Sequence, residues 1–282
     1  MATLLKGAAV ADAINERSKA DIPALAERGI TPTLAMVRVG SRGDDIAYEN
    51  GASKRCDKVG VKVKSIVLPE DVTQSGLLET IEDLNRDRLV HGVLIFMPLP
   101  KHLDGEAVRR ALLPEKDVDG ITSGSLAGVF TGSGEGFAPC TAQACIEILD
   151  YYGVDCRGKR AVVVGRSLVV GKPAAMLLMA KNATVTTCHT KTVDMPSITK
   201  NAEILIAAAG KANALGAEYL SRGQTVIDVG INFIDGKMCG DVDFAAAEPV
   251  VGAITPVPGG VGTVTTSVLV SHVVEAANRQ NI

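Results

Sequence analysis

The chain has 282 residues, a length that suits one large domain or two modest ones. Hydrophobic residues make up 46 % of it and charged residues 22 %, as in an ordinary globular protein with a packed core. The net charge is −3, and the lysines and arginines are spread along the sequence instead of gathering in one stretch. Because nucleic acid phosphates require a concentrated basic face, the composition argues against a nucleic-acid partner.

The N-terminal segment predicts a protein without a secretory leader, because Lys6 and Asp12 interrupt it before an apolar region can form. No apolar run reaches the roughly 18–20 residues needed to span a bilayer, so no membrane association is expected. The six cysteines show no C-x-x-C spacing, which favours reduced thiols over a disulfide framework or a metal site. We therefore expect a cytoplasmic protein.

Short apolar, β-branched runs alternate with helical patterns along the whole chain, which is typical of an α/β fold with parallel sheets. In the first half we predict strands near 33–39, 62–67 and 91–97, and helices near 46–58 and 74–86. In the second half we predict strands near 160–164, 183–187, 203–208 and 225–229.

The division into domains is predicted from composition. The segment 120–138 is rich in glycine and serine, so we place the connection between two domains there. The stretch from Gly262 onwards has a helical pattern and is expected to pack back against the first domain. We therefore expect one α/β domain at 1–139 with the C-terminal helix 264–282, and a second domain with a Rossmann-type parallel sheet at 140–263.

A dinucleotide site is indicated by residues 160–178, which read RAVVVGRSLVVGKPAAMLL. An apolar strand ends at Gly165, a turn follows, and Gly171-Lys172-Pro173 opens a helix whose free N–H groups can hold a pyrophosphate. The pattern is G-x-S-x-x-x-G-x-P, so it matches the common G-x-G-x-x-G fingerprint only approximately. A packing turn without a ligand is the alternative.

The next predicted strand bears on the choice of cofactor. Enzymes specific for NAD carry an acidic residue about 20 residues further on, which accepts the ribose hydroxyl. Here the strand ends in Cys188-His189-Thr190-Lys191 without an acid. Arg166, Thr190 and Lys191 can donate to a 2′-phosphate, so the segment favours NADP over NAD. A solvated loop end is the alternative.

Seven short motifs occur along the chain in one order, and together they show a family resemblance. They are VVVGRSLVVGKP, ATVTTCH, KDVDG (116–120), PLPKH (98–102), APCT (138–141), VIDVGIN (226–232) and TPVPGGVG (255–262). Over essentially its whole length the chain resembles the bifunctional methylenetetrahydrofolate dehydrogenase/cyclohydrolase family. The resemblance implies an N-terminal catalytic domain, a C-terminal Rossmann domain, a cleft for a tetrahydrofolate substrate between them, and a homodimer.

The resemblance also implies roles for residues that match the family's motifs. Tyr48 matches the tyrosine that stacks on the substrate, and Asp119 matches the acid that holds the pterin. The remaining matches are a folate-side loop (Pro258, Gly259, Gly260, Val261, Gly262), a cofactor loop (Gly165, Arg166, Ser167) and a backbone contact near the nicotinamide (Ile231).

Each of these matches has a structural alternative. Tyr48 could cover a helix face, Asp119-Gly120 could serve a turn, and the glycines of the folate-side loop could serve a strained backbone. Cys140 lies in the matching PCT segment, but we interpret it as a buried thiol outside catalysis.

Two departures from the family pattern concern one of its two reactions. The family has Tyr-x-x-x-Lys, with both side chains on one helical face, whereas Ala52 follows Tyr48 at that spacing here. The family also has a glutamine two residues before PLPKH, where this chain has Phe96. Smaller departures are Ala142, Ala144 and Thr263.

The chemistry of the two reactions makes these departures informative. Hydride transfer from 5,10-methylenetetrahydrofolate to NADP needs alignment and no general base, whereas opening the methenyl product with water needs a proton-transfer group. We therefore predict an NADP-dependent dehydrogenase with weak or absent cyclohydrolase activity, working beside a separate cyclohydrolase.

Three alternatives remain open at this stage. Lys54, six residues after Tyr48, could replace the missing lysine and restore a bifunctional enzyme. The chain could also be a non-catalytic NADP- or folate-binding module. More remotely, it could be a dehydrogenase for a small hydroxy or amino acid.

Overall fold

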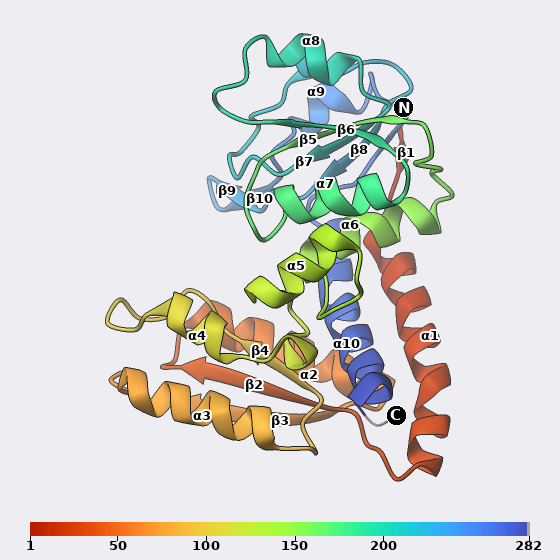
Figure 1. Cartoon of the computed structure of the whole chain (residues 1–282). Coiled ribbons are helices and arrows are strands. Elements are labelled where there is room, and N and C mark those ends of the chain that lie inside the picture. The colour runs from red at the N-terminus through yellow and green to blue at the C-terminus, as the bar shows by residue number, and fades with distance from the viewer. Residues whose placement is uncertain (281–282) are drawn as a thin grey trace. The chain divides into compact units, whose positions relative to one another are not determined.

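The computed structural model describes residues 1–280, which form two compact units (Figure 1). Unit 1 consists of Met1–Ala11 and Thr141–Thr265, and unit 2 consists of Asp12–Cys140 with the chain from Thr266 onwards. The last two residues of the predicted helix 264–282 lie outside the described residues.

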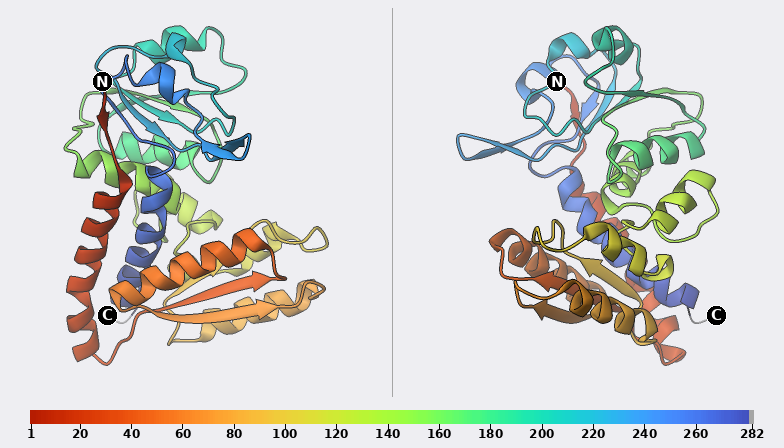
Figure 2. Two further views of the ribbon diagram at one scale, coloured as in Figure 1. Left: turned by 180° about the vertical axis from the view of Figure 1, so that it is seen from behind. Right: turned by 60° about the vertical axis from the view of Figure 1, so that its left-hand side comes forward.

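Unit 2 is built on a three-stranded parallel sheet with the order β3-β2-β4. Its strands are β2 (Thr33–Val39), β3 (Lys62–Leu68) and β4 (Gly92–Ile95), and they are connected by α2 (Gly43–Val59) and α3 (Gln74–Arg86). The two connecting helices cover the sheet in Figure 2. On the α3 side, the buried Leu77 and Ile81 pack with Val37 and Ile95 of the sheet. The alternation of these apolar residues along the strands is what drives the sheet and the helix together.

Unit 2 also contains shorter helices and most of the two long helices of the chain. These elements are α1 (Gly7–Glu27), α4 (Gly105–Ala111), the 3-10 turn η1 (Pro114–Lys116), α5 (Ser123–Thr131) and α10 (Val261–Gln280). Within residues 1–280, no helix is both long and apolar enough to cross a membrane.

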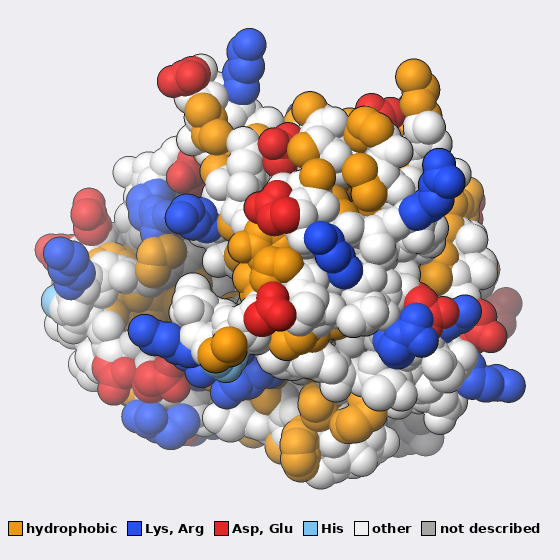
Figure 3. Space-filling model, turned by 90° about the horizontal axis from the view of Figure 1, so that it is seen from above, with side chains coloured by type: hydrophobic (Ala, Val, Ile, Leu, Met, Phe, Trp, Pro, Cys, Tyr) orange, Lys and Arg blue, Asp and Glu red, His pale blue; other side chains and the backbone are white. Residues whose placement is uncertain are grey.

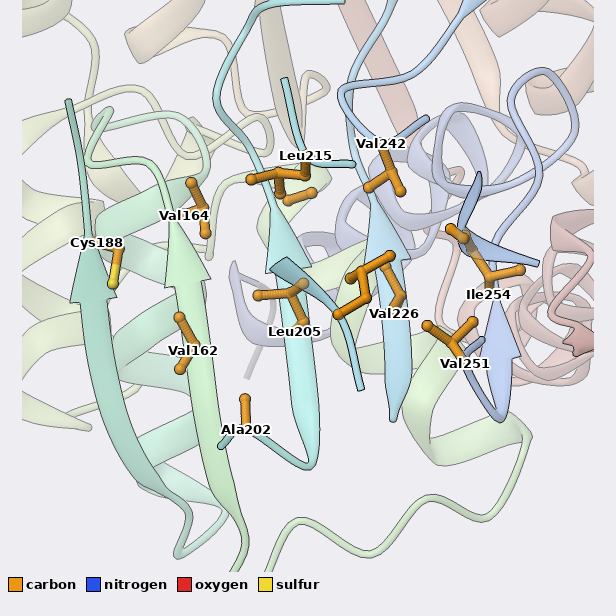
Figure 4. Packing of buried hydrophobic residues seen from close by; sticks show 13 residues of the cluster. Val162, Val164, Cys188, Ala202, Leu205, Leu215, Val226, Val242, Val251 and Ile254 are labelled. Carbon is orange, nitrogen blue, oxygen red and sulfur yellow. The ribbon is translucent and has the colours of Figure 1, made fainter. Parts of the chain in front are cut away.

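Unit 1 is built on a six-stranded sheet in which every pairing is parallel. The strands, in spatial order, are β1 (Thr3–Leu4), β11 (Ala253–Ile254), β8 (Thr225–Asp228), β7 (Ile204–Ala207), β5 (Arg160–Val164) and β6 (Thr184–Cys188). Val162, Leu205 and Val226, from three of these strands, share one buried apolar layer (Figure 4). This order and direction are those of a doubly wound, Rossmann-type sheet.

The other elements of unit 1 surround this sheet. They are α6 (Cys140–Tyr151), α7 (Gly171–Ala180), α8 (Met195–Lys200), the 3-10 turn η2 (Ala217–Tyr219), the antiparallel hairpin β9 (Asn232–Ile234) and β10 (Lys237–Cys239), and α9 (Phe244–Ala247). On the face of the molecule drawn in Figure 3, basic and acidic side chains are interspersed, in line with the small net charge.

The two-domain α/β fold and the predicted strands are confirmed, with two differences in organisation. The segment 120–138, predicted as a plain connection, contains the helix α5, which Thr122 caps by accepting a hydrogen bond from Ser125 N at 3.1 Å. The first eleven residues, expected in the N-terminal domain, belong to unit 1, because β1 pairs with β11.

Candidate active site

The predicted cofactor loop follows β5, at the point where the order of the strands in the sheet of unit 1 reverses. The next strand along the chain, β6, pairs on one side of β5 and β7 pairs on the other, so Gly165 lies at the topological switch point. Gly165 has a φ of +137°, and a Cβ atom there would lie 2.1 Å from Ala208 O. Only glycine fits this position, and ligands of such sheets bind at this edge.

Ser167 holds the start of α7 in place. Its hydroxyl accepts hydrogen bonds from Val170 N at 3.1 Å and Gly171 N at 3.4 Å. A Cβ atom on Gly171 would lie 2.3 Å from Gly165 O, so the glycine allows the helix to begin directly against the turn. The helix N-terminus therefore faces the same edge of the sheet as Gly165, which suits an anionic pyrophosphate.

The register of β5 and β6 brings Arg166 and Thr190 to the same edge. Val164 pairs with Cys188 across the two parallel strands, and each of the two polar residues follows its strand residue by two positions. The turn after β6 is fixed because His189 Nδ1 accepts a hydrogen bond from Lys191 N at 3.1 Å.

The side chains in this region are available for an anion. Arg166, Thr190 and Lys191 are all exposed. Within residues 1–280, neither Arg166 nor Lys191 is engaged in an ion pair. Two exposed cations and a hydroxyl can hold a phosphate, so the structure brings together the residues that the sequence predicted for NADP.

Ile231 and the predicted folate-side loop are neighbours within unit 1. Ile231 exposes 61 % of its surface, and a Cβ atom added to Gly262 would lie 3.7 Å from Ile231 Cδ1. Gly259 has a φ of +100°, and a Cβ atom on Gly260 would lie 2.5 Å from Pro256 O. The loop Pro258–Gly262 thus needs Gly259 and Gly260 for its backbone, and it also presents an exposed edge beside Ile231.

A buried acid that the sequence did not predict supports this region. The carboxylate of Asp228, at the end of β8, accepts hydrogen bonds from Gly230 N at 2.9 Å, Asp241 N at 2.9 Å and Val242 N at 3.0 Å. Burial raises the pKa of Asp228 to about 6, against the effect of these donors. The network fixes the start of the segment that carries Ile231.

In unit 2, Tyr48 is the first predicted residue of the substrate site. It lies on α2, one helical turn before Ala52 and therefore on the same side of the helix. Its ring meets Phe96 edge-on, with 6.0 Å between ring centroids and an interplanar angle of 83°. Its hydroxyl hydrogen-bonds Thr266, and burial of the hydroxyl raises the pKa of Tyr48, while 37 % of the residue stays exposed.

Asp119 is a partly buried acid that the local turn does not use. The turn is held by Asp117, whose carboxylate accepts hydrogen bonds from Ile121 N at 3.0 Å and Thr122 N at 2.7 Å. Burial, and then the charge of Asp117, raises the pKa of Asp119 to about 7, while a hydrogen bond from the Cys140 thiol favours the charged form. The charge of Asp119 also raises the pKa of the Tyr48 hydroxyl, so the structure brings these two predicted residues near each other.

Ala52, Phe96 and Lys54 differ sharply in exposure. Ala52 is fully buried in the α2 stripe that includes Asp45 and Cys56, and Phe96 is 7 % exposed. Lys54 is exposed and lies outside this buried stripe. The position that holds a lysine in the family pattern is therefore a buried alanine here, and Lys54 is exposed to solvent.

The fold and the two sets of side chains define a two-domain α/β protein with a dinucleotide-binding domain. A family model described as tetrahydrofolate dehydrogenase/cyclohydrolase, catalytic domain, matches residues 5–119, and the NAD(P)-binding domain of the same family matches residues 139–281. The chain belongs to the tetrahydrofolate dehydrogenase/cyclohydrolase family, as its motifs predicted.

Relatives of known name match over nearly the full length. The bifunctional protein FolD of Alkaliphilus oremlandii is 48 % identical over 282 residues, covering 100 % of this chain and 99 % of the relative. A crystal structure of the bifunctional enzyme FolD from Campylobacter jejuni is 38 % identical, with a TM-score of 0.95 and 99 % of both chains covered. The FolD structure from Trypanosoma brucei, complexed with NADP cofactor and an inhibitor, is 34 % identical with a TM-score of 0.90, covering 99 % of this chain and 98 % of that one.

Proposed function

We propose that this protein oxidises 5,10-methylenetetrahydrofolate to 5,10-methenyltetrahydrofolate with NADP, and that its cyclohydrolase activity is weak or absent. Membership of the family supports the first part, because both of its domains match. The observation that carries the second part is the full burial of Ala52, a residue without a proton-transfer group, together with the contact of Tyr48 with Phe96.

NADP is favoured over NAD by the side chains at the ends of β5 and β6. Arg166 and Lys191 supply positive charge there, and no acidic residue competes for the ribose hydroxyl. The Trypanosoma brucei relative with NADP bound supports the same choice. When bound, the cofactor accepts the hydride, and the residues of this chain position it.

On the substrate side, Tyr48 and Asp119 have separate tasks. The exposed part of the Tyr48 ring provides an apolar surface on which an aromatic substrate ring can stack. The carboxylate of Asp119, which the turn does not use, accepts hydrogen bonds from the pterin amino and ring N–H groups. The nitrogens of the folate stabilise the cation formed by hydride loss, so alignment is the protein's main contribution.

The second reaction lacks its proton-transfer group. Adding water to the methenyl carbon and opening the ring require a group that gives and takes protons, and neither alanine nor phenylalanine does so. Lys54 is exposed and stands apart from the buried stripe of α2. The methenyl product should therefore dissociate from the enzyme without being hydrolysed, and a separate cyclohydrolase should consume it.

The test is an assay of the purified protein with methylenetetrahydrofolate and either NADP or NAD. We expect NADPH and methenyltetrahydrofolate to accumulate together, with little turnover of added methenyltetrahydrofolate above the buffer rate. Absence of NADP reduction would favour a non-catalytic binding module. Rapid hydrolysis that disappears in Lys54→Ala would instead favour the bifunctional alternative.

The assembly and location complete the proposal. We expect a cytoplasmic homodimer. The hairpin β9–β10 exposes Phe233 (66 %), Ile234 (43 %) and Met238 (38 %), apolar surface that a second copy of the chain could cover. Light scattering should give twice the mass of one chain, whereas a monomeric mass would exclude the homodimer.

A further inference from the structure

The backbone oxygen of Val118, directly before Asp119, lies within hydrogen-bond distance of two buried side chains. His272 Nδ1 lies 2.9 Å from this oxygen, and Cys140 Sγ lies 3.2 Å from it. His272 and Cys140 are 7 % and 2 % exposed, so water does not compete for these contacts. The Phe137 ring packs on the imidazole with 4.9 Å between centroids.

The carbonyl oxygen fixes the tautomer of His272. A carbonyl oxygen only accepts hydrogen bonds, so His272 Nδ1 carries the proton in its contact with Val118 O. The same nitrogen then has no lone pair for the Cys140 thiol, which lies 3.7 Å away. The thiol proton is left with two acceptors, Val118 O and the carboxylate of Asp119.

We propose that His272 is a positioning residue for the dehydrogenase reaction: by donating to Val118 O it holds the backbone next to Asp119 and leaves the Cys140 thiol free to donate to the Asp119 carboxylate. The inference rests on the proposed function, in which charged Asp119 binds the pterin. Nothing in the sequence pattern pointed to His272, which lies 132 residues from Cys140 along the chain.

The pKa of Asp119 is a sensitive measure of whether the Cys140 thiol donates to its carboxylate. Burial and Asp117 disfavour its charged form, the thiol of Cys140 favours it, and the resulting pKa of about 7 lies in the range where enzymes are assayed. The other charged groups packed here are Arg279, whose guanidinium lies 4.5 Å from the Phe137 ring centroid, and Glu275, which pairs with it. Tyr48 faces Asp119 as a neutral group, because burial raises the pKa of its hydroxyl.

Two substitutions separate the donor from the bulk of the side chain. His272→Leu removes the donor, so the Cys140 thiol should turn to Val118 O and the pKa of Asp119 should rise. We expect the acidic limb of kcat/KM for methylenetetrahydrofolate to move to higher pH, with KM near neutral pH raised about fivefold. The kcat at high pH and the KM for NADP should change little. His272→Asn places an amide N–H near the Nδ1 position and should restore both values.

Cys140 provides a second pair of variants, which tests the proposal even if His272→Leu does not fold. Cys140→Ser keeps a donor, so the acidic limb of kcat/KM should stay at or below its wild-type pH. Cys140→Ala removes the donor and should move the acidic limb to higher pH. His91→Leu is the matched control, because His91 is equally buried in unit 2 but its Nδ1 accepts from Thr33 N. It should lower stability without moving the limb.

The outcomes are distinguishable from failure of the proposed function. A wild-type protein that does not oxidise methylenetetrahydrofolate refutes the function itself. An active wild type whose limb is the same in His272→Leu and in Cys140→Ala overturns the positioning role. An equal shift in His91→Leu would overturn it as well, because the shift would then reflect general loosening of unit 2.

Discussion

At the scale of single residues, Asp119, the proposed acceptor for the pterin, carries a cost in stability. Its pKa lies at about 7 in the folded protein, above the ordinary value of 3.8, because burial and Asp117 disfavour its charge. The native state therefore holds this proton more tightly than the unfolded chain between these two pH values. The free energy of unfolding falls as pH rises through this range and stays lower above it.

Asp119→Asn removes that ionisation and should produce a more stable but inactive protein. At pH 8 we expect the free energy of unfolding to increase by about 1–3 kcal/mol, less than the full conversion of the pKa shift because the side chain is partly exposed. At pH 4 the difference should vanish. Denaturant titrations at both pH values measure this. Turnover should collapse, since the amide presents a donor to the pterin donors, while NADP affinity stays unchanged.

Asp117→Asn is the matched control for this prediction. Asp117 is fully buried and uses both carboxylate oxygens, for Ile121 N and Thr122 N. An amide nitrogen would face one of these N–H groups, so this variant should be less stable at every pH. Equal behaviour of the two variants would contradict the assignment of separate tasks to the two acids.

Arg166 carries the prediction about cofactor choice. If its guanidinium contacts the 2′-phosphate, Arg166→Ala should weaken NADP roughly ten- to a hundredfold and NAD much less, since a charge-assisted hydrogen bond contributes about 1.5–3 kcal/mol. Arg222→Ala is the control, because Arg222 is exposed and precedes β8, at the opposite edge of the sheet. Binding of both cofactors can be measured by titration. Equal weakening of NADP and NAD would remove Arg166 from the phosphate site.

At the scale of elements, the sequence predicted the strands well because buried parallel strands are short, apolar and bounded by turn residues. The stretch 33–39 became β2 and 160–164 became β5 with the predicted bounds. The helix α5 was missed, because its glycine and serine content is typical of a loop and its stability comes from close packing. A Cβ atom on Gly128, for example, would lie 2.0 Å from Glu135 O.

The helix α2 is held on its sheet by an ion pair that bears on the site. Glu49 directly follows Tyr48, and its carboxylate pairs with Arg38 of β2 at 2.9 Å. Both side chains are largely buried, at 11 % and 13 % exposed, and Ser65 also donates to Glu49. The ion pair therefore holds the part of α2 that carries Tyr48 against the sheet.

Glu49→Gln should consequently be costly. It leaves the Arg38 charge without its partner in a poorly solvated place, and we expect a loss of about 2–4 kcal/mol in the free energy of unfolding. The KM for the folate should rise, whereas NADP binding should be unaffected, because both residues belong to unit 2. Glu82→Gln, in the exposed pair with Arg86, should cost less than about 0.5 kcal/mol. A similar loss in both variants would mean that burial of the Arg38–Glu49 pair contributes nothing.

At the scale of the whole molecule, the candidate site contains some residues that the sequence indicated and others that it did not. Tyr48 and Asp119 stand in motifs and were named from them. His272 lies in none of the motifs, and Asp228 lies in VIDVGIN, from which the sequence indicated only Ile231. Their contacts join segments that are 154 and 14 residues apart, so they emerge only when the chain is folded. Local patterns therefore predicted the candidate binding residues, whereas the contacts of His272 and Asp228 depend on packing between distant segments.

The proposed loss of the second activity is also a property of the whole molecule, because it requires two substitutions on different elements. Ala52 lies on α2 and Phe96 follows β4, and the two positions meet around Tyr48. Ala52→Lys alone should gain little, because the new amine would enter a buried position with Phe96 in place of a hydrogen-bonding partner. The double change Ala52→Lys with Phe96→Gln supplies both the amine and the amide.

We expect the double variant to hydrolyse methenyltetrahydrofolate at least tenfold faster than the wild type. General acid–base groups typically contribute about 10²–10⁴-fold, and imperfect placement of the new amine and amide should reduce the gain below that range. Dehydrogenase activity should survive, since hydride transfer needs no base. Decay of the methenyl absorbance, corrected for the buffer rate, measures the gain, and Ala52→Lys alone and Phe96→Gln alone are the controls. A wild type that already hydrolyses rapidly would show that this site needs neither group. A double variant that folds and oxidises its substrate but shows no gain would show that the lysine and glutamine positions are not what limits the second reaction.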